Sequence, residues 1–280
     1  MESHYPLLAR IKQPSDLRKY TEKELEQLAK EVREVIIDVV SKNGGHLSSN
    51  LGVVELTIAL HRVFTSPKDK IIWDVGHQCY THKLLTGRVH EFPTLRQKDG
   101  MSGFPKRSES IHDILDTGHS STSLSAGIGL LVGQELQHKE GKVIAVIGDG
   151  SLTAGMAFEA LNCIGHLQKN MIIVLNDNNM SISPNVGALS LYLSRLTATH
   201  FYQDIRKRID STVKGIPYLG GKLYELVVRL KKGIKAVFFK ENLFSDLGFE
   251  YVGPIDGHNI PLLLWIFRNV KKLRKPIVVH

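Results

Sequence analysis

Two short apolar runs, separated by one helical segment, constrain this 280-residue chain more than any other feature. The runs are residues 143–147 and 171–175, and residues from about 153 to 167 between them repeat apolar side chains with helical spacing. Because both runs are continuously apolar rather than alternating, they predict strands of a sheet that is covered on both faces. A strand, a crossover helix and a second strand in one sheet form a parallel unit. The sequence therefore predicts an α/β fold, a doubly wound, mainly parallel sheet with helices on both faces.

Other segments predict elements around this unit. Helical spacing also occurs in residues 22–40, before the Gly44-Gly45 pair, and in residues 51–64. Residues 71–75 and 277–279 have the character of short strands. Residues 118–123 form a loop of small residues that opens a Gly- and Ala-rich helix, which we expect to be buried. We expect residues 1–280 to form one domain, with a mobile helical insertion at about 184–245.

Composition and charge narrow the class of protein. The net charge of +8 arises after residue 200, where 15 basic and 7 acidic side chains lie. A solvated helical surface explains this excess of basic residues better than a site that binds nucleic acid or another polyanion, because no pattern of aromatic residues among the basic ones accompanies the charge. Cys79 and Cys163 lie far apart, which argues against a disulfide framework and a structural zinc site. The sequence has no apolar run of about 18 residues and no visible leader, so we expect the protein in the cytoplasm. A plastid is the alternative if the source is plant-like.

The loops after the two central strands carry oxygen ligands. Asp149 lies in a Gly148-Asp149-Gly150 turn, and Asn178 lies 29 positions later in an Asn-rich loop. Because the carboxyl ends of parallel strands meet at one edge of a sheet, both side chains can reach one ion. Mg²⁺ prefers such oxygen ligands together with phosphate oxygens, and glycines allow a phosphate to approach the backbone. The turn alone would be an ordinary turn, but with the Asn-rich loop it predicts a site for Mg²⁺ and a diphosphate.

Together with these two loops, five longer segments resemble the 1-deoxy-D-xylulose-5-phosphate synthase family of transketolase-like thiamine diphosphate enzymes. Long ordered strings of this kind are specific, and the resemblance covers about residues 15–280, thinning between 190 and 245. The segments are Ser-Lys-Asn-Gly-Gly-His-Leu-Ser-Ser-Asn-Leu-Gly at 41–52, Trp-Asp-Val-Gly-His-Gln at 73–78, Ser-Gly-Phe-Pro-Lys at 102–106, Gly-His-Ser-Ser-Thr-Ser at 118–123 and Gly-Pro-Ile-Asp-Gly-His at 253–258.

The resemblance implies roles for particular residues. The side chains of Asp149 and Asn178 and the carbonyl group of Met180 would hold Mg²⁺. His46 and His77, each of which follows a glycine in a predicted loop, would be catalytic and would face the thiazolium ring as neutral imidazoles that shuttle protons. The residues that would contact thiamine diphosphate are His77, Gly118, His119, Ser120, Gly150, Ser151 and Asn178.

The same resemblance implies a transferase that decarboxylates pyruvate and joins the remaining fragment to D-glyceraldehyde 3-phosphate, feeding isoprenoid, thiamine and pyridoxal biosynthesis. In this family the cofactor lies between such a domain and a pyrimidine-binding domain. No segment here matches that domain or the C-terminal domain, so the chain alone is expected to be inactive and to form a homodimer or to associate with the pyrimidine-binding half. Neither nucleic acid nor a membrane is expected as a partner.

One local departure and two alternatives stay open. Leu115-Asp116 stands where the family usually has Phe-Gly, and a carboxylate there would weaken phosphate binding unless it points away. The chain could instead be a non-catalytic fragment, or a split transketolase-type subunit that binds Mg-diphosphate.

Overall fold

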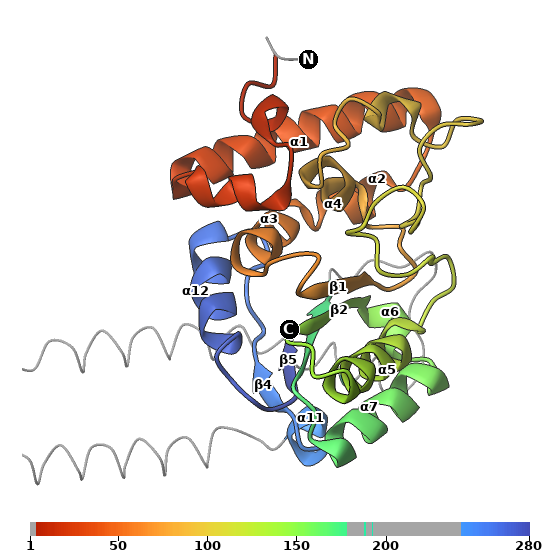
Figure 1. The fold of residues 1–280 in the computed structure, drawn as a ribbon, viewed down its shortest axis with the longest axis vertical. Helices are drawn as coiled ribbons and strands as arrows, with labels where there is room; N and C mark the ends of the chain where they lie inside the picture. Colours follow the sequence, from red (N-terminus) through yellow and green to blue (C-terminus); the bar gives the residue numbers. More distant parts are fainter. Residues whose placement is uncertain (1–3, 178–187, 189–191, 193–241) are drawn as a thin grey trace, which may run out of the picture.

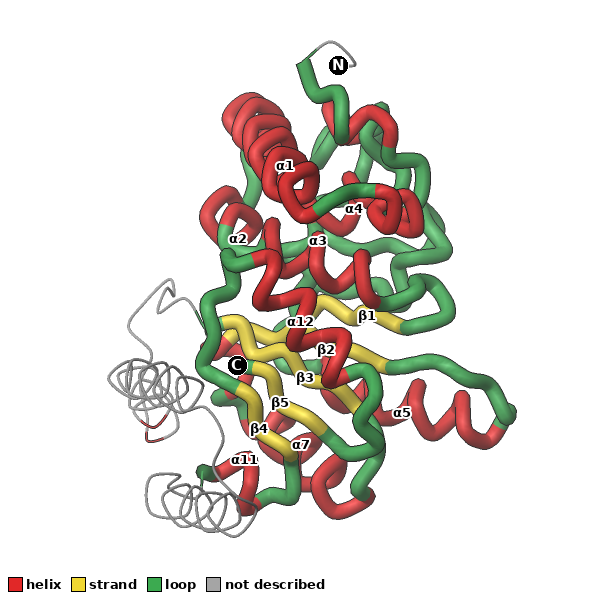
Figure 2. Tube along the Cα trace, turned by 90° about the vertical axis from the view of Figure 1, so that its left-hand side faces the viewer, coloured by secondary structure: helices red, strands yellow, loops and turns green. Residues whose placement is uncertain are grey.

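A computed structural model of the chain describes residues 4–177, 188, 192 and 242–280. Those residues contain a five-stranded sheet of order β1-β2-β3-β5-β4, in which every neighbouring pair of strands is parallel. Figure 2 shows the strands side by side between layers of helices. The strands are β1 (Lys70–Trp73), β2 (Val143–Gly148), β3 (Met171–Asn176), β4 (Glu250–Val252) and β5 (Ile277–Val279).

Helices cover both faces of the sheet, as Figure 1 shows, which confirms the predicted doubly wound α/β fold. On one face lie α3 (Val54–Val63) and α12 (Ile260–Val270), with α1 (Glu22–Asn43) outside them. On the other face lie α5 (Ser123–Leu136) and α7 (Gly155–Leu167). The shorter helices are α2 (Leu47–Leu51), α4 (Tyr80–Leu85), α6 (Asp149–Leu152), α11 (Leu243–Asp246) and the 3-10 turns η1 (Leu8–Arg10), η2 (Pro14–Lys19) and η3 (Phe92–Thr94).

Strand β2 explains why the central runs are apolar at every position. Ile144 and Val146 point into the cluster formed with α1, α3 and α12, whereas Val143, Ala145 and Ile147 point into the cluster formed with α5 and α7. All five side chains are fully buried. Each face of the strand therefore contributes to a separate core, as expected for a sheet covered on both sides.

Three predicted helices differ from the structure in their bounds. The helix predicted at 22–40 continues to Asn43 and ends where Gly44 adopts a φ of 75°. The helix predicted at 51–64 is two helices, α2 and α3, and the helix predicted at 153–167 begins at Gly155, after the separate turn of α6. The expectation that the Gly- and Ala-rich helix is buried holds for one face only. Leu124 and Leu131 of α5 are buried, but Leu136 is 77% exposed.

Most of the insertion predicted at 184–245 lies outside the described residues. In the ranges that the structure does describe, no helix has both the length and the apolar character needed to cross a membrane.

Candidate active site

A buried carboxylate ties two of the predicted loops together at the carboxyl edge of the sheet. Asp74, the residue after β1, is 1% exposed and accepts hydrogen bonds from the backbone N–H groups of Ser121 (2.8 Å) and Ser123 (3.1 Å) at the start of α5. The hydroxyl of Ser121 donates to the carbonyl oxygen of Ser151, 2.8 Å away in α6. The loop of Gly118, His119 and Ser120 is therefore held beside the Gly148-Asp149-Gly150 turn.

The glycines of these two loops leave open space. A Cβ atom added at Gly118 or at Gly148 would meet no atom within 4 Å, whereas one added at Gly76 would overlap Thr117 and Pro105. Gly148, Asp149, Gly150 and Ser151 are half-buried, and Gly118, His119 and Ser120 are exposed. The backbone at this edge is thus accessible to a ligand on the side where Asp149 lies. Since α6 spans only four residues, N–H groups offered to a phosphate here come from the turn rather than from the end of a long helix.

The end of β3 is joined to the same edge by Gln78. The register pairs Gly148 with Asn176, and the side-chain amide of Asn176 donates to the Oε1 atom of Gln78 at 3.2 Å. Because β2 lies between β1 and β3, Gln78 reaches from the loop after β1 across the end of β2. This bond fixes the start of the Asn-rich loop. Two predicted metal ligands in that loop, Asn178 and Met180, lie outside the described residues.

The two predicted catalytic histidines lie together. The rings of His46 and His77 are 5.4 Å apart between centroids, edge to face, and the ring of Phe104 lies 6.1 Å from that of His46. Burial lowers the pKa of His46, and the charge of Arg96 lowers it further. Burial also lowers the pKa of His77, with His46 adding to the effect and Asp74 opposing it. Both imidazoles are therefore neutral at neutral pH.

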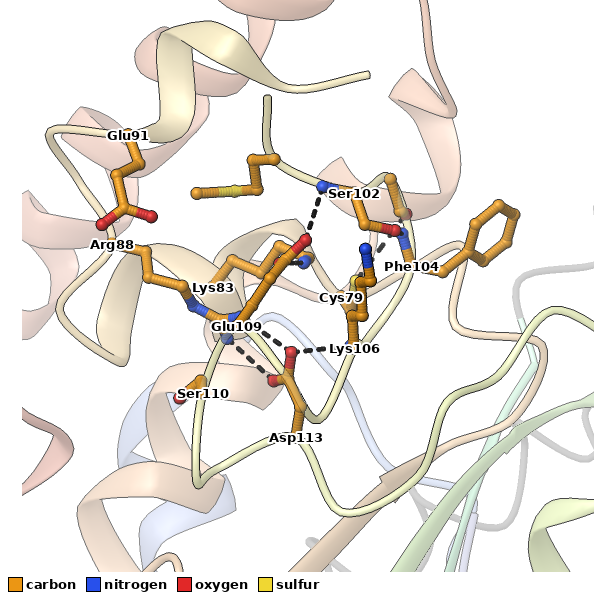
Figure 3. A network of polar contacts seen from close by, with 12 residues as sticks. Cys79, Lys83, Arg88, Glu91, Ser102, Phe104, Lys106, Glu109, Ser110 and Asp113 are labelled. Atoms are coloured by element: carbon orange, nitrogen blue, oxygen red, sulfur yellow. Dashed lines mark hydrogen bonds and ion pairs between the residues drawn. The ribbon is translucent and has the colours of Figure 1, made fainter. Parts of the chain in front are cut away.

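A buried charge network holds the loop that carries Phe104 (Figure 3). Asp113 receives hydrogen bonds from Arg88 (2.7 and 2.8 Å) and pairs with His82 at 2.9 Å. Its Oδ2 atom also accepts from the backbone N–H of Lys106 at 2.9 Å. Burial alone would raise the pKa of the Asp113 carboxyl, but the bonds from His82 and Arg88 outweigh it and hold that pKa well below its usual range. The ionised carboxylate therefore anchors the loop two residues beyond Phe104.

Asp116, which departs from the family pattern, pairs with an arginine. The Asp116 carboxylate accepts hydrogen bonds from the backbone N–H of Arg107 (2.7 Å) and from the Nε atom of the same residue (3.1 Å). The negative charge of Asp116, two residues before Gly118, is therefore offset by an arginine in an exposed ion pair. His119 makes a local contact, its Nδ1 atom lying 2.9 Å from the carbonyl oxygen of Ser120.

Comparison with known proteins decides the family. A family profile described as 1-deoxy-D-xylulose-5-phosphate synthase matches residues 8–280. The chain belongs to the 1-deoxy-D-xylulose-5-phosphate synthase family. It is 54% identical over 274 residues to the 1-deoxy-D-xylulose-5-phosphate synthase of Brevibacillus brevis, covering 98% of this chain and 44% of that protein. It is 55% identical over 274 residues to that of Heliobacterium modesticaldum, covering 98% and 42%.

The chain spans less than half the length of these relatives of the 1-deoxy-D-xylulose-5-phosphate synthase family. Solved structures with the same fold include transketolase from Campylobacter jejuni, with a TM-score of 0.64 and 19% identity over 93% of this chain and 37% of that one. Transketolase from Leishmania mexicana has a TM-score of 0.63 and 17% identity, covering 91% of this chain and 36% of that one. At these identities the likeness concerns the fold.

Proposed function

We propose that this chain is the part of a 1-deoxy-D-xylulose-5-phosphate synthase that binds the diphosphate group of thiamine diphosphate together with Mg²⁺. The observation that carries the proposal is the pair of hydrogen bonds by which Ser121 joins Asp74 to Ser151. These bonds hold the open glycine loops at Gly118 and Gly148 beside each other, next to Asp149. Membership of the synthase family supports the same conclusion.

Buried polar atoms at this edge fit a polar ligand. Within the described part of the chain, His77 Nδ1, Gln78 Nε2 and Ser123 Oγ are buried without a hydrogen-bond partner. A buried polar atom left unpaired costs about 1–3 kcal/mol, so a ligand that pairs with such atoms gains affinity. All three belong to the loops that Asp74 and Gln78 hold in place. Polar atoms without a protein partner thus gather in the loops that we propose to surround the cofactor.

Asp149 would hold Mg²⁺, with Asn178 and the carbonyl group of Met180 as further ligands. Gly118, His119, Ser120, Gly150 and Ser151 would contact thiamine diphosphate through backbone and hydroxyl groups. The cofactor supplies the electron sink that the loss of CO₂ from pyruvate requires. The neutral imidazole of His77 offers its Nδ1 atom to accept or hold a proton, and His46 stands beside it.

The substrates that we propose are pyruvate and D-glyceraldehyde 3-phosphate. A phosphorylated acceptor and a diphosphate cofactor both require cationic or N–H-rich surroundings, and the pairing of Asp116 with Arg107 leaves these loops without an uncompensated carboxylate at that position.

We also propose that the outer face of α5 and α7 contacts a second copy of the chain. Leu136 is 77%, Met156 51% and Phe158 43% exposed, and a Cβ atom added at Gly129 of α5 would meet nothing within 4 Å. An exposed group of large apolar side chains suits a symmetric contact. Sedimentation velocity of Phe158→Glu should show a weaker dimer than the native chain, and a native chain that sediments as a monomer at all concentrations refutes the contact.

Calorimetric titration of thiamine diphosphate, with and without Mg²⁺, tests the cofactor site. We expect Mg²⁺-dependent binding to the native chain, weakened at least about tenfold in Asp149→Asn. Asp38→Asn, which changes an exposed carboxylate on α1, is the matched control and should bind as the native chain does. Binding that is equal in Asp149→Asn and the native chain would remove Asp149 from the metal site.

A further inference from the structure

One fully buried asparagine bonds to both predicted catalytic histidines. The Nδ2 atom of Asn50 donates to the carbonyl oxygen of His46 at 2.6 Å and to that of His77 at 2.7 Å. Its Oδ1 atom accepts the backbone N–H of Tyr80 at 2.9 Å. Asn50 is 0% exposed, so its amide group is shielded from bulk water.

We infer that Asn50 is a positioning residue, which sets the separation and orientation of the His46–His77 pair by holding both backbone segments with one amide group. The inference rests on the proposed function, because it assigns the pair a shared task. His46 precedes α2 and His77 follows β1, so the two rings meet only if these two segments are joined.

The chemistry of the amide explains why an asparagine stands here. A primary amide offers two N–H donors and a carbonyl acceptor in one plane, and Asn50 uses both donors and the acceptor. A serine has a single donor, and an ionised aspartate has none. Truncation would therefore leave two backbone carbonyl groups without their common donor.

A second, longer hydrogen bond also joins the segment of His46 to the segment that follows His77, in which Tyr80 lies. The backbone N–H of His46 donates to the hydroxyl of Tyr80 at the longer distance of 3.3 Å. The tyrosine hydroxyl does not reach His77 by any hydrogen bond that the described residues make. Loss of Asn50 should consequently leave only this longer bond of the four, and the His46 segment should move more easily relative to His77.

Asn43, in the same segment at 41–52, offers a control substitution for Asn50. The Nδ2 atom of Asn43 also donates to two backbone carbonyl oxygens, those of Pro93 (2.9 Å) and Leu95 (3.0 Å). The bonding pattern is that of Asn50, but neither carbonyl belongs to a histidine. Asn50→Ala and Asn43→Ala therefore each remove an amide group that bonds two backbone carbonyl oxygens, the first fully buried and the second half-buried, and only the first touches the pair.

Nuclear magnetic resonance of histidine-labelled chain, without cofactor, tests the inference. In Asn50→Ala we expect loss of the cross-relaxation between the His46 and His77 rings, and both titration midpoints should rise toward that of a free histidine. Asn43→Ala should keep the native cross-relaxation and midpoints. Native values for both properties in a folded Asn50→Ala chain would overturn the inference.

Circular dichroism establishes whether Asn50→Ala folds, and Asn50→Ser, which keeps one donor, takes its place where it does not. A measurement on the native chain stands apart from any substitution: the side-chain amide protons of Asn50 should exchange slowly and show scalar coupling to the carbonyl carbons of His46 and His77. Fast exchange without coupling would also overturn the inference. Because the cofactor is absent throughout, failure of the Asp149→Asn titration would leave this result unaffected, and the reverse holds as well.

Discussion

The Nε2 atom of His61 lies 2.9 Å from the Nδ1 atom of His82 in the core, and the planes of the two rings are inclined by 26°. The other ring nitrogen of His82 faces the carboxylate of Asp113 at 2.9 Å, so it donates to that carboxylate. In neutral His82 the Nδ1 atom then accepts a hydrogen bond from the Nε2–H group of His61. Burial lowers the pKa of both histidines, so both are neutral within one directed chain of hydrogen bonds that ends on a charged carboxylate.

These hydrogen-bonded histidines predict that the folded protein loses stability in mild acid. Burial lowers the pKa of His61 far below its usual value, and burial lowers the pKa of His82 despite the opposing effect of Asp113. Below about pH 6.5 the unfolded state binds protons at these histidines that the folded state does not, so the free energy of unfolding falls as the pH falls. The contribution is at most about 1.4 kcal/mol per pH unit for each histidine.

Urea unfolding from about pH 7.5 to about pH 5.5 measures this effect. His61→Gln should show a smaller loss of stability over that interval than the native chain, since one of the groups no longer titrates. His166→Gln, which changes an exposed histidine on α7, should keep the native loss. An equal pH dependence in native chain and His61→Gln would contradict the assignment.

Removal of Asp113 should destabilise the fold strongly. Asp113→Ala leaves the guanidinium group of Arg88 buried and without its main partner, and the cost of such a broken buried pair is about 3–5 kcal/mol. Asp116→Ala removes an exposed partner of Arg107, for which we expect less than about 1 kcal/mol. Denaturant unfolding of both variants checks the contrast, and similar values for the two would show that the buried network does not anchor the core.

The two cysteines should differ in reactivity. Burial raises the pKa of the Cys79 thiol to about 12, and Cys79 is fully buried, whereas Cys163 is half-buried on α7. Because the thiolate is the reactive form, a thiol reagent at mildly alkaline pH should modify one cysteine in the native chain and both after unfolding. Cys163→Ser should show no rapid modification. Rapid modification of Cys79 in the folded chain would be inconsistent with its position.

Substitution by alanine should change the stability of the fold in opposite directions at two helix glycines. A Cβ atom at Gly165 of α7 would overlap the backbone carbonyl group of Leu247, so Gly165→Ala should destabilise the chain by about 1–3 kcal/mol. A Cβ atom at Gly133 of α5 would meet nothing within 4 Å, so Gly133→Ala should stabilise it by about 0.5–1 kcal/mol. Thermal unfolding distinguishes the signs, and a destabilised Gly133→Ala would indicate that this face of α5 is already covered.

Local patterns predict the central strands well and the supporting residues poorly. Residues 143–147 and 171–175 are recognisable because burial on both faces leaves a continuous apolar run. Helix α12 went unpredicted although Asn259 caps it, Pro261 stands in its first turn and its apolar residues have helical spacing. That signal was present in the sequence, within a stretch whose excess of basic residues suggested only a solvated surface.

The motifs located Asp149 and the histidine pair, whose closeness the structure then showed, but Asp74, Gln78 and Asn50 were missed as individual contributors. The role of each depends on a partner that is distant in sequence: Asp74 bonds Ser121 and Ser123, and Gln78 bonds Asn176. A lone polar residue in a loop has no periodicity from which such a partner can be inferred. Tertiary structure alone identifies these residues, because burial turns their few hydrogen bonds into constraints.

The position of β5 between β3 and β4 also governs how the sheet can assemble during translation. Strands β1, β2 and β3 can pair in the order in which they leave the ribosome, together with α5 and α7. The outer edge of β3 pairs with β5, which is synthesised last of the five strands, at residues 277–279. Strand β4 is synthesised earlier, but it pairs with β5 rather than with β3. Among the described strands, therefore, none pairs with this edge of β3 until residues 277–279 have been synthesised, and an unpaired strand edge is where pairing with a neighbouring nascent chain competes with correct folding.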